Sequence, residues 1–321
     1  MSHSATAATQ TLVPKKGWAR MWLNFKRHWQ LHLMLLLPTL YLLLFNYGPM
    51  YGIQIAWKEY SPRAGIWGSE WVGWKNFAKF FQYRLWYKLI WNTLAVSLYD
   101  LISGFPLPIF LALVMHVHTG KFLKKLSQNV SYIPHFISLV TMVGILNTVL
   151  NPVSGVLGFF YRQLNIYSYD DIRGSKEAFR HLFVWSGHWQ SMGWGTIIYL
   201  SALSAVPEEL HEAAKLDGAS RLRRVFAIDL PTLMPLIALK LILNMGGIMS
   251  VGAQKAYLMQ NQMNLEVSEL ISTYVYKEGM RKANMSFGSA VGLMNSFVNT
   301  TLVFIVNWIT NLLTDGEMGL F

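Results

Sequence analysis

The residues of this 321-residue chain that could perform chemistry do not occur at the spacings that catalysis requires. Gly120-Lys121 is followed by Phe122 and lacks the upstream glycine of a phosphate-binding loop, so no ATP site is expected on this chain. His211-Glu212 could begin a zinc-binding pair on a helix, but Lys215 stands where the second histidine is needed. The sequence has no cysteine and no Gly-x-Ser-x-Gly turn. We therefore expect any chemistry, and any cofactor, to belong to a partner.

The segment 207–231 has the local features of two short helices joined by a turn. Pro207 suits a first helical position, Gly218 can supply the left-handed residue that ends the first helix, and Ser220 can cap the second. Pro231 and Pro235 are expected to break the chain before the next apolar block. The second helix is expected to turn three apolar residues inward, Leu222, Val225 and Phe226. A stiff, polar hairpin of this kind is typical of a docking element.

The elements that must position this hairpin are membrane helices. Hydrophobic residues make up 53% of the chain and charged residues only 13%, and the apolar residues collect in blocks of about 20 or more, the length that spans a bilayer as a helix. The sequence predicts an all-α membrane protein with six transmembrane helices and both termini on one side. The predicted spans are 32–56, 90–115, 130–150, 182–205, 234–253 and 288–313.

The residues before the first span form a basic arm. Trp18, Trp22, Phe25 and Trp29 recur at helical spacing among lysines and arginines, which favours an amphipathic helix in the lipid headgroup layer; a frayed basic arm with scattered tryptophans is the alternative. The expected domains are thus the arm 1–30, a membrane domain 31–313 and a short tail 314–321.

The hairpin also carries a family resemblance. Glu212-Ala213-Ala214, Gly218, Ile228 and Leu230-Pro231 stand at the spacing of the EAA motif of permease subunits of ATP-binding-cassette (ABC) importers. Segments 49–58, 65–73, 133–138 and 268–276 resemble the polysaccharide-oligomer branch of the maltose importer-like carbohydrate permeases. Within that branch the chain is most similar to permease subunits of bacterial alginate importers. The resemblance covers most of residues 31–310 and implies the type I importer permease fold.

The resemblance implies a role for the hairpin and a set of partners. In the family, the EAA loop forms a coupling helix that docks on a cytoplasmic ATPase, which places the loop and both termini in the cytoplasm. It implies that the ATPase-coupling residues here are Glu212, Ala213, Ala214, Asp217 and Gly218. The expected partners are a second homologous permease, an ATPase dimer that carries ATP and Mg, and a periplasmic solute-binding protein, all assembled at the bacterial inner membrane.

The substrate path is expected on the helices that flank the EAA loop, where the maltose importer's permease contacts sugar. By position, the resemblance implies Trp189, Gln190 and Trp194 before the loop, and Asn244 with Gly247 after it; Asn295 on the last span is a further candidate. Aromatic rings suit sugar faces and amides suit hydroxyls, although an interfacial aromatic belt is an alternative interpretation of these tryptophans. Lys240, a charge inside a span, is either a substrate-facing cation or a structural residue, and we interpret Asp100 as structural.

The charge balance bears on the substrate. The formal net charge is +11, and on the implied orientation the outer loops carry 14 basic and 8 acidic residues. Such a field would attract an anionic glycan, although docking of an acidic binding protein explains the same excess. The cations are spread among membrane loops, so nucleic-acid binding is not expected.

Together these features predict an oligo- or polysaccharide importer subunit for alginate or another uronate-containing glycan. A permease for a neutral oligosaccharide is the alternative within the family. An ATPase-independent secondary transporter is the alternative from another class, and a membrane-bound enzyme is disfavoured because no catalytic constellation is present.

Overall fold

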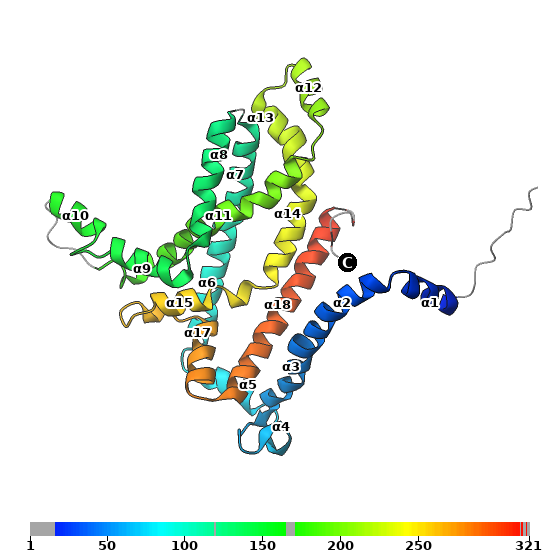
Figure 1. Cartoon of the computed structure of the whole chain (residues 1–321). Coiled ribbons are helices and arrows are strands. Elements are labelled where there is room, and N and C mark those ends of the chain that lie inside the picture. Colours follow the sequence, from blue (N-terminus) through cyan, green and yellow to red (C-terminus); the bar gives the residue numbers. More distant parts are fainter. Residues whose placement is uncertain (1–16, 119, 165–170, 315, 317–318, 320–321) are drawn as a thin grey trace, which may run out of the picture. The chain divides into compact units, whose positions relative to one another are not determined.

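The computed structural model describes residues 17–118, 120–164, 171–314, 316 and 319. The predicted arm before residue 17 and most of the tail after residue 314 lie outside the described residues. The chain divides into two compact units, Met1–Gln54 and Ile55–Phe321. The helices are drawn in Figure 1, and each unit is described separately.

The first unit is helical throughout its described part. Helix α1 (Gly17–Arg27) is followed by α2 (Trp29–Leu42), a π-helical turn at Leu43–Tyr47 and α3 (Gly48–Met50). A helix in the arm agrees with the sequence prediction, and the side chains of Trp22 and Phe25 are exposed on it. Pro38 lies inside α2 without ending it, and no residue of α2 is buried, as expected for an apolar helix that faces lipid or partners.

The second unit begins with a small irregular region. Strand β1 (Lys58–Glu59) pairs antiparallel with β2 (Glu70–Trp71), and α4 (Gly65–Gly68) lies between them. Helix α5 (Lys75–Gln82) follows, and its buried Asn76 donates hydrogen bonds to the backbone oxygens of Ala56 and Lys58. These bonds fix the start of the helical bundle.

The bundle itself is built from helices of 4 to 29 residues. Its helices are α6 (Trp86–Gly104), α7 (Pro106–Val117), α8 (Lys121–Tyr132), α9 (Leu139–Val149), α10 (Val156–Gln163), α11 (Lys176–Leu203), α12 (Glu208–Leu216), α13 (Arg221–Arg224), α14 (Leu230–Met245), α15 (Ala253–Met259), α16 (Leu265–Ser268), α17 (Ile271–Val275) and α18 (Met285–Leu313). Figure 1 shows α12 and α13 at one end of the bundle and α5 at the other.

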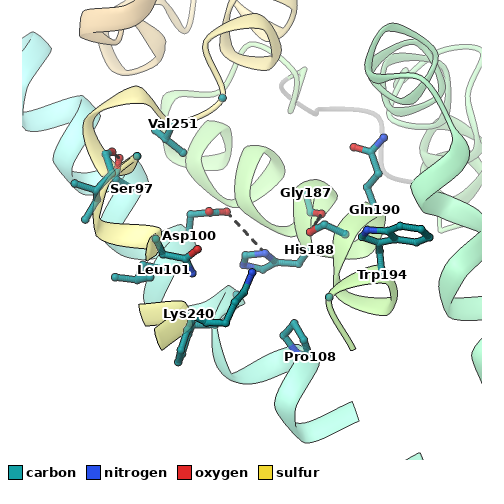
Figure 2. Close-up of a pocket in the computed structure, with 18 of the residues that line it drawn as sticks. Ser97, Asp100, Leu101, Pro108, Gly187, His188, Gln190, Trp194, Lys240 and Val251 are labelled. Atoms are coloured by element: carbon teal, nitrogen blue, oxygen red, sulfur yellow. Dashed lines mark hydrogen bonds and ion pairs between the residues drawn. The ribbon is translucent and has the colours of Figure 1, made fainter. Parts of the chain in front are cut away.

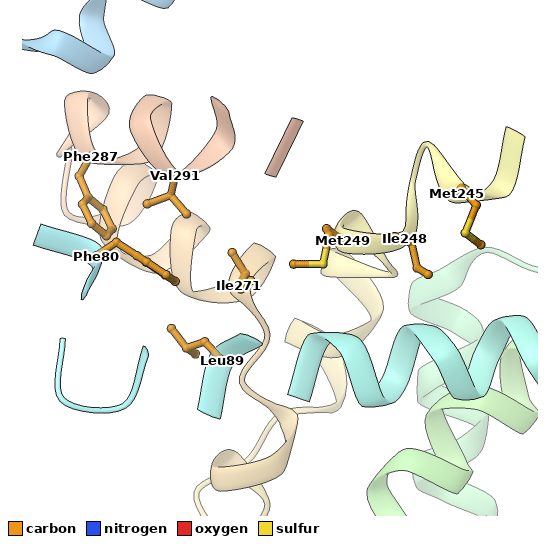
Figure 3. Packing of buried hydrophobic residues seen from close by; sticks show 8 residues of the cluster. All are labelled: Phe80, Leu89, Met245, Ile248, Met249, Ile271, Phe287 and Val291. Atoms are coloured by element: carbon orange, nitrogen blue, oxygen red, sulfur yellow. The ribbon is translucent and has the colours of Figure 1, made fainter. Parts of the chain in front are cut away.

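Buried apolar clusters hold these helices together. One cluster joins α7, α11 and α14 through residues that include Ala112, Leu203 and Leu233, each 0% exposed. A second joins α5, α6, α17 and α18 with the segment after α14 (Figure 3). Small residues allow the closest approaches, as is usual in membrane bundles: Gly195 of α11 faces Pro108 of α7, and Gly193 faces the backbone of Ser131 in α8.

The number of spans is only partly as predicted. Among the described residues, four helices are long and apolar enough to cross a membrane: Trp29–Trp57, Trp86–Val117, Arg221–Met245 and Met285–Leu313. The predicted span 130–150 falls in a bent pair of helices, Phe122–Phe136 and Leu139–Val149, which together are long and apolar enough to cross and meet at an angle of 101°. The predicted span 182–205 lies in α11, a 28-residue helix too polar for that group.

The fifth predicted span, 234–253, is shifted along the chain. Helix α14 ends at Met245, and a short 3-10 turn at Ile248–Ser250 follows it. Pro231 lies at the start of α14 and Pro235 lies inside it, so the expected break before this span is absent. The helix runs from the π-helical turn Val225–Asp229 through both prolines, which membrane helices tolerate where neighbouring groups satisfy the carbonyls that proline leaves free.

Candidate functional site

A polar cavity lies among the membrane helices of the second unit. Its volume is about 690 Å³, and its walls come from α6, α7, α11, α14 and the segment between α14 and α15 (Figure 2). Its polar lining consists of Ser97, Asp100, His188, Gln190, Ser191, Tyr199, Lys240, Asn244 and Lys255. We call this space the central cavity.

The structure brings most of the predicted path residues together in the central cavity. Gln190, Trp194, Lys240, Asn244 and Gly247 all line it, although they come from two helices about fifty residues apart in the chain. We predicted the substrate path on the helices before and after the hairpin. These five residues of the predicted path all lie at the central cavity.

Two predicted path residues lie elsewhere. Trp189 points to a separate apolar pocket of about 390 Å³, which α9 and α11 line with residues that include Met142, Leu146 and Trp185. Asn295, in α18, lies outside the lining of the central cavity and is partly buried. Trp189 precedes Gln190 on the same helix, so the two side chains necessarily face different directions.

Gln190 and Trp194 are held by the bent segment between α8 and α9. The Gln190 side-chain amide donates a hydrogen bond of 2.7 Å to the backbone oxygen of Ile137. The indole of Trp194 stacks on the ring of His135, with centroids 4.4 Å apart and planes 3° apart. The bend at residues 137–138 thus positions one amide and one aromatic ring at the cavity wall.

Charged groups gather in one part of the central cavity, where Figure 2 shows Asp100, His188 and Lys240. The Asp100 carboxylate lies 3.8 Å from Nδ1 of the buried His188 ring, and the other ring nitrogen lies 2.8 Å from Ser103 Oγ. Asp100, which we interpreted as structural, therefore also lines the cavity. Intramembrane charges are costly and are usually tied to transport or to a partner charge.

Sequence reasoning missed Lys255. Its side chain is 6% exposed, its Nζ donates to the backbone oxygen of Phe183 at 2.5 Å, and it lies 4.7 Å from the centroid of the Phe183 ring. We assigned this residue to an outer loop because it follows the predicted span 234–253. The chain turns back into the bundle at Gly252, whose φ of +45° is a left-handed conformation that the sequence alone does not reveal.

The hairpin has the predicted two-helix form. Helix α12 ends before Gly218, whose φ is +75°, and the Ser220 hydroxyl accepts a hydrogen bond from the backbone N–H of Arg223 at the start of α13. Glu212, Ala213 and Asp217 are exposed on it, and Ala214 is partly buried. The motif residues therefore present a surface at one end of the bundle.

The expectation that the hairpin turns Leu222 and Phe226 inward is wrong. Their side chains are 71% and 66% exposed, and of the three predicted residues only Val225 is buried. Leu222 and Phe226 are four residues apart and therefore share one helical face, which is exposed, whereas Val225 lies on the face that packs against the bundle. With Leu216, which is 89% exposed, the hairpin displays an apolar patch of the kind that marks interaction sites.

Comparisons with known proteins agree on one family. The model described as "Binding-protein-dependent transport system inner membrane component" matches residues 104–316. The polygalacturonan/rhamnogalacturonan transport system permease protein YteP of Bacillus subtilis is 38% identical over 99% of this chain and 98% of its own length. The arabinooligosaccharides transport system permease protein AraP of the same organism is 26% identical over 65% of this chain and 66% of its own length.

Solved structures show the same relationship. A chain from the crystal structure of a bacterial ABC transporter involved in the import of the acidic polysaccharide alginate is 33% identical and has a TM-score of 0.83; the match covers 92% of this chain and 99% of that one. A chain from the bacterial alginate ABC transporter in complex with an alginate pentasaccharide-bound periplasmic protein has a TM-score of 0.84 at 32% identity, with 94% and 100% covered.

Proposed function

This chain belongs to the family of binding-protein-dependent transport system inner membrane components, and from that membership we propose that it imports a uronate-containing oligo- or polysaccharide. As a member it is a multi-pass permease subunit of an ABC transporter and a non-catalytic membrane component, as predicted. The acidic character of the glycan and the roles of individual residues are the proposal.

The observation that carries the acidic substrate is the charged lining of the central cavity. Lys240, Lys255 and His188 line it with a single carboxylate, Asp100. A carboxylated sugar can form an ion pair with a lysine of this lining, whereas a neutral sugar cannot. The relatives that share a third or more of their residues with this chain include proteins named for polygalacturonan and for alginate, both of which are polyuronates.

The path residues have complementary roles in this proposal. Trp194 offers a ring face to the apolar face of a sugar, and Gln190 and Asn244 offer amides to hydroxyl groups. Gly247, just after the end of α14, keeps the backbone accessible. Lys240 lies one helical turn before Asn244 on α14 and supplies a cation to the same cavity wall. Trp189 and Asn295 stay predictions without a place in this cavity.

ATP-driven operation requires a connection to a separate ATPase. We propose that Glu212, Ala213, Ala214, Asp217 and Gly218 dock in an ATPase dimer that binds ATP and Mg, which places the hairpin and both termini in the cytoplasm. The exposed Leu216 and Leu222 add an apolar contact to the charge of Glu212. A second permease and a periplasmic solute-binding protein complete the proposed importer.

The six-span topology is part of the same proposal. The four apolar helices, the bent pair at residues 122–149 and α11 together give six crossings, with polar α11 surrounded by other helices. Alternating access around a site near the middle of the membrane then follows from closure of the ATPase dimer.

A competition experiment tests the substrate class. Uptake of labelled oligogalacturonate or oligoalginate is measured in proteoliposomes with the permeases, ATPase and binding protein, in the presence of unlabelled uronate oligomers or neutral maltooligosaccharides. We expect competition only by the uronates. Competition by the neutral oligomers alone would establish the neutral-oligosaccharide alternative, and uptake without ATP would establish a secondary transporter.

The coupling assignment is tested separately with Glu212→Ala, because Glu212 is exposed and its removal leaves the bundle packing unchanged. We expect loss of most substrate-stimulated ATP hydrolysis and uptake with unchanged assembly of the permease pair. Glu208→Ala, at an exposed position in the first turn of the same helix, is the matched control. Normal coupling in Glu212→Ala would contradict the assignment.

A further inference from the structure

Three side chains from separate elements converge at the base of the hairpin. His116 comes from the last turn of α7, His211 from α12, and Asp229 from the end of the π-helical turn before α14. One possible ligand atom from each lies within 4.8 Å of the others. The sequence excludes a zinc pair at positions 211 and 215, but the fold supplies a second histidine from another helix.

Two of the three convergent atoms lack hydrogen-bond partners among the described residues. Asp229 is 1% exposed, and within the described residues neither its Oδ1 nor the buried Nε2 of His211 has a hydrogen-bond partner. These two atoms lie 3.2 Å apart, yet their orientation does not form a hydrogen bond. A buried carboxylate without a partner is costly, and a cation shared with the imidazoles would remove that cost.

The spacing suits a small transition-metal ion. Bonds of about 2.0–2.2 Å in a tetrahedron place neighbouring ligand atoms about 3.3 Å apart. His211 Nε2 lies 3.2 Å and His116 Nε2 lies 3.7 Å from Asp229 Oδ1, close to this spacing, and the two histidine atoms lie within 4.8 Å of each other. Two imidazoles and one carboxylate form a donor set that Zn²⁺ accepts, and the adjoining pocket of about 420 Å³ leaves room for water as the fourth ligand.

The adjoining pocket carries charges of both signs. Lys215, Arg221, Arg224 and Glu208 also line it, and the buried Nε of Arg224 has no hydrogen-bond partner among the described residues. These bases could attract an anion such as phosphate. However, the three converging atoms include the Asp229 carboxylate oxygen, which would repel an anion and bind a metal.

We propose that His116, His211 and Asp229 form a three-ligand site for a Zn²⁺-class transition metal. The site links α7, the hairpin and the start of α14, so a bound ion fixes the hairpin on the helical bundle. The proposal concerns metal binding by this chain and stands independently of the transported sugar.

The experiment uses the full-length chain in detergent with an affinity tag that contains no histidine. Equilibrium dialysis against Zn²⁺ measures stoichiometry, and Co²⁺ is added as a spectroscopic probe. We expect one ion per chain, visible absorption bands typical of four-coordinate Co²⁺, and a Zn²⁺-dependent rise in Tm. The single variants His116→Gln, His211→Asn and Asp229→Asn should each weaken Zn²⁺ binding at least tenfold and abolish the Co²⁺ bands.

His118→Gln is the matched control, since this exposed histidine lies two residues from His116 and outside the cluster. It should bind metal as the unaltered chain does. Zn²⁺ binding that survives in the three single variants would overturn the proposal, as would absence of stoichiometric binding in an unaltered chain that is monodisperse. A Tm raised by inorganic phosphate and unaffected by Zn²⁺ would assign the pocket to an anion instead. If a single variant is not monodisperse, the Co²⁺ spectrum of the unaltered chain decides the ligand set.

Discussion

Asn244 is the simplest polar residue of the central cavity to test, because its side chain is exposed to the cavity on a helix that otherwise packs through apolar residues. Asn244→Leu keeps the side-chain size and removes the amide. If the amide bonds a sugar hydroxyl, kcat/KM for uptake should fall about tenfold, which corresponds to about 1.4 kcal/mol. Initial uptake rates at several substrate concentrations measure this.

Asn295→Leu is the control for this prediction, since Asn295 lies outside the cavity lining. Uptake by Asn295→Leu should stay within twofold of normal. The opposite order of effects, a loss in Asn295→Leu and none in Asn244→Leu, would move the path away from the central cavity. Gln190 is less suited to the test because its amide also bonds the backbone of Ile137.

Gly193 is a residue at which packing rather than chemistry restricts the side chain. A methyl group there would overlap the backbone carbonyl of Ser131, whereas a methyl group at Gly292 would meet no atom within 4 Å. Gly193→Ala should therefore lower stability by about 1–3 kcal/mol, and Gly292→Ala should leave it unchanged or raise it by up to about 1 kcal/mol. Thermal unfolding in detergent, followed by a fluorescent dye, compares the two; equal Tm values would contradict the close contact of α8 and α11.

The types of the residues were enough to predict which helices line the cavity, but not the direction in which each side chain points. Polar side chains inside apolar blocks are few, so Gln190, Lys240 and Asn244 could be selected from sequence alone. The direction of Trp189 could not, because it depends on the rotation of α11 against α7 and α9. Lys255 was missed because its place in the cavity depends on the left-handed turn at Gly252, which sequence spacing does not reveal.

At the scale of elements, apolar length predicted where helices occur but not where they bend. The bend at residues 137–138 comes after Pro134, and Ser138 then caps α9 by accepting a hydrogen bond from the backbone of Thr141. Pro235, in contrast, lies inside α14 without ending it. Proline has no backbone N–H to donate in either place. Whether the helix breaks there depends on the neighbouring helices that pack against it.

An ion network joins the first turns of α6 and α11 to the short helix α16. Glu266 of α16 bonds Lys88 of α6 and Lys176 of α11, each at 2.6 Å. The hydrogen bonds and charges of the two lysines lower the pKa of Glu266 to about 2. Because the folded-state pKa lies below the ordinary value of 4.5, the stabilisation is complete above that value and is lost as the pH falls towards about 2.

Glu266→Gln should therefore lower Tm by an amount that is constant from neutral pH down to the ordinary carboxyl range and shrinks as the medium becomes more acidic. Tm is measured for both proteins across this range. The effect should be small because the carboxylate is exposed to solvent. Glu70→Gln, at an exposed position outside the network, is the control. A difference that grows on acidification would contradict a lowered pKa.

At the scale of the whole molecule, the family and the helical membrane architecture were predictable because they depend on long apolar blocks and on a motif with fixed spacing. Those features survive substitution of many individual residues, as the 38% identity to YteP over 99% of the chain illustrates. The exposed faces of the hairpin were not predictable in the same way. Leu222 and Phe226 were expected inside because a lone chain should bury them, whereas a subunit can leave such residues for a partner.

The net charge of +11 gives a prediction for the complete importer. If the basic outer loops attract a polyuronate, uptake of oligoalginate should slow as salt screens that field. The Debye length falls from about 30 Å at 0.01 M to about 10 Å at 0.1 M salt, so KM should rise several-fold over this interval while kcat changes little.

A binding protein that docks through charge would produce the same trend for any sugar. A reference importer is therefore needed: a relative that transports a neutral oligosaccharide, assayed with its own binding protein, reports docking alone. A salt response equal in the two systems would assign the positive charge to docking, and a larger response for the uronate would assign it to the substrate.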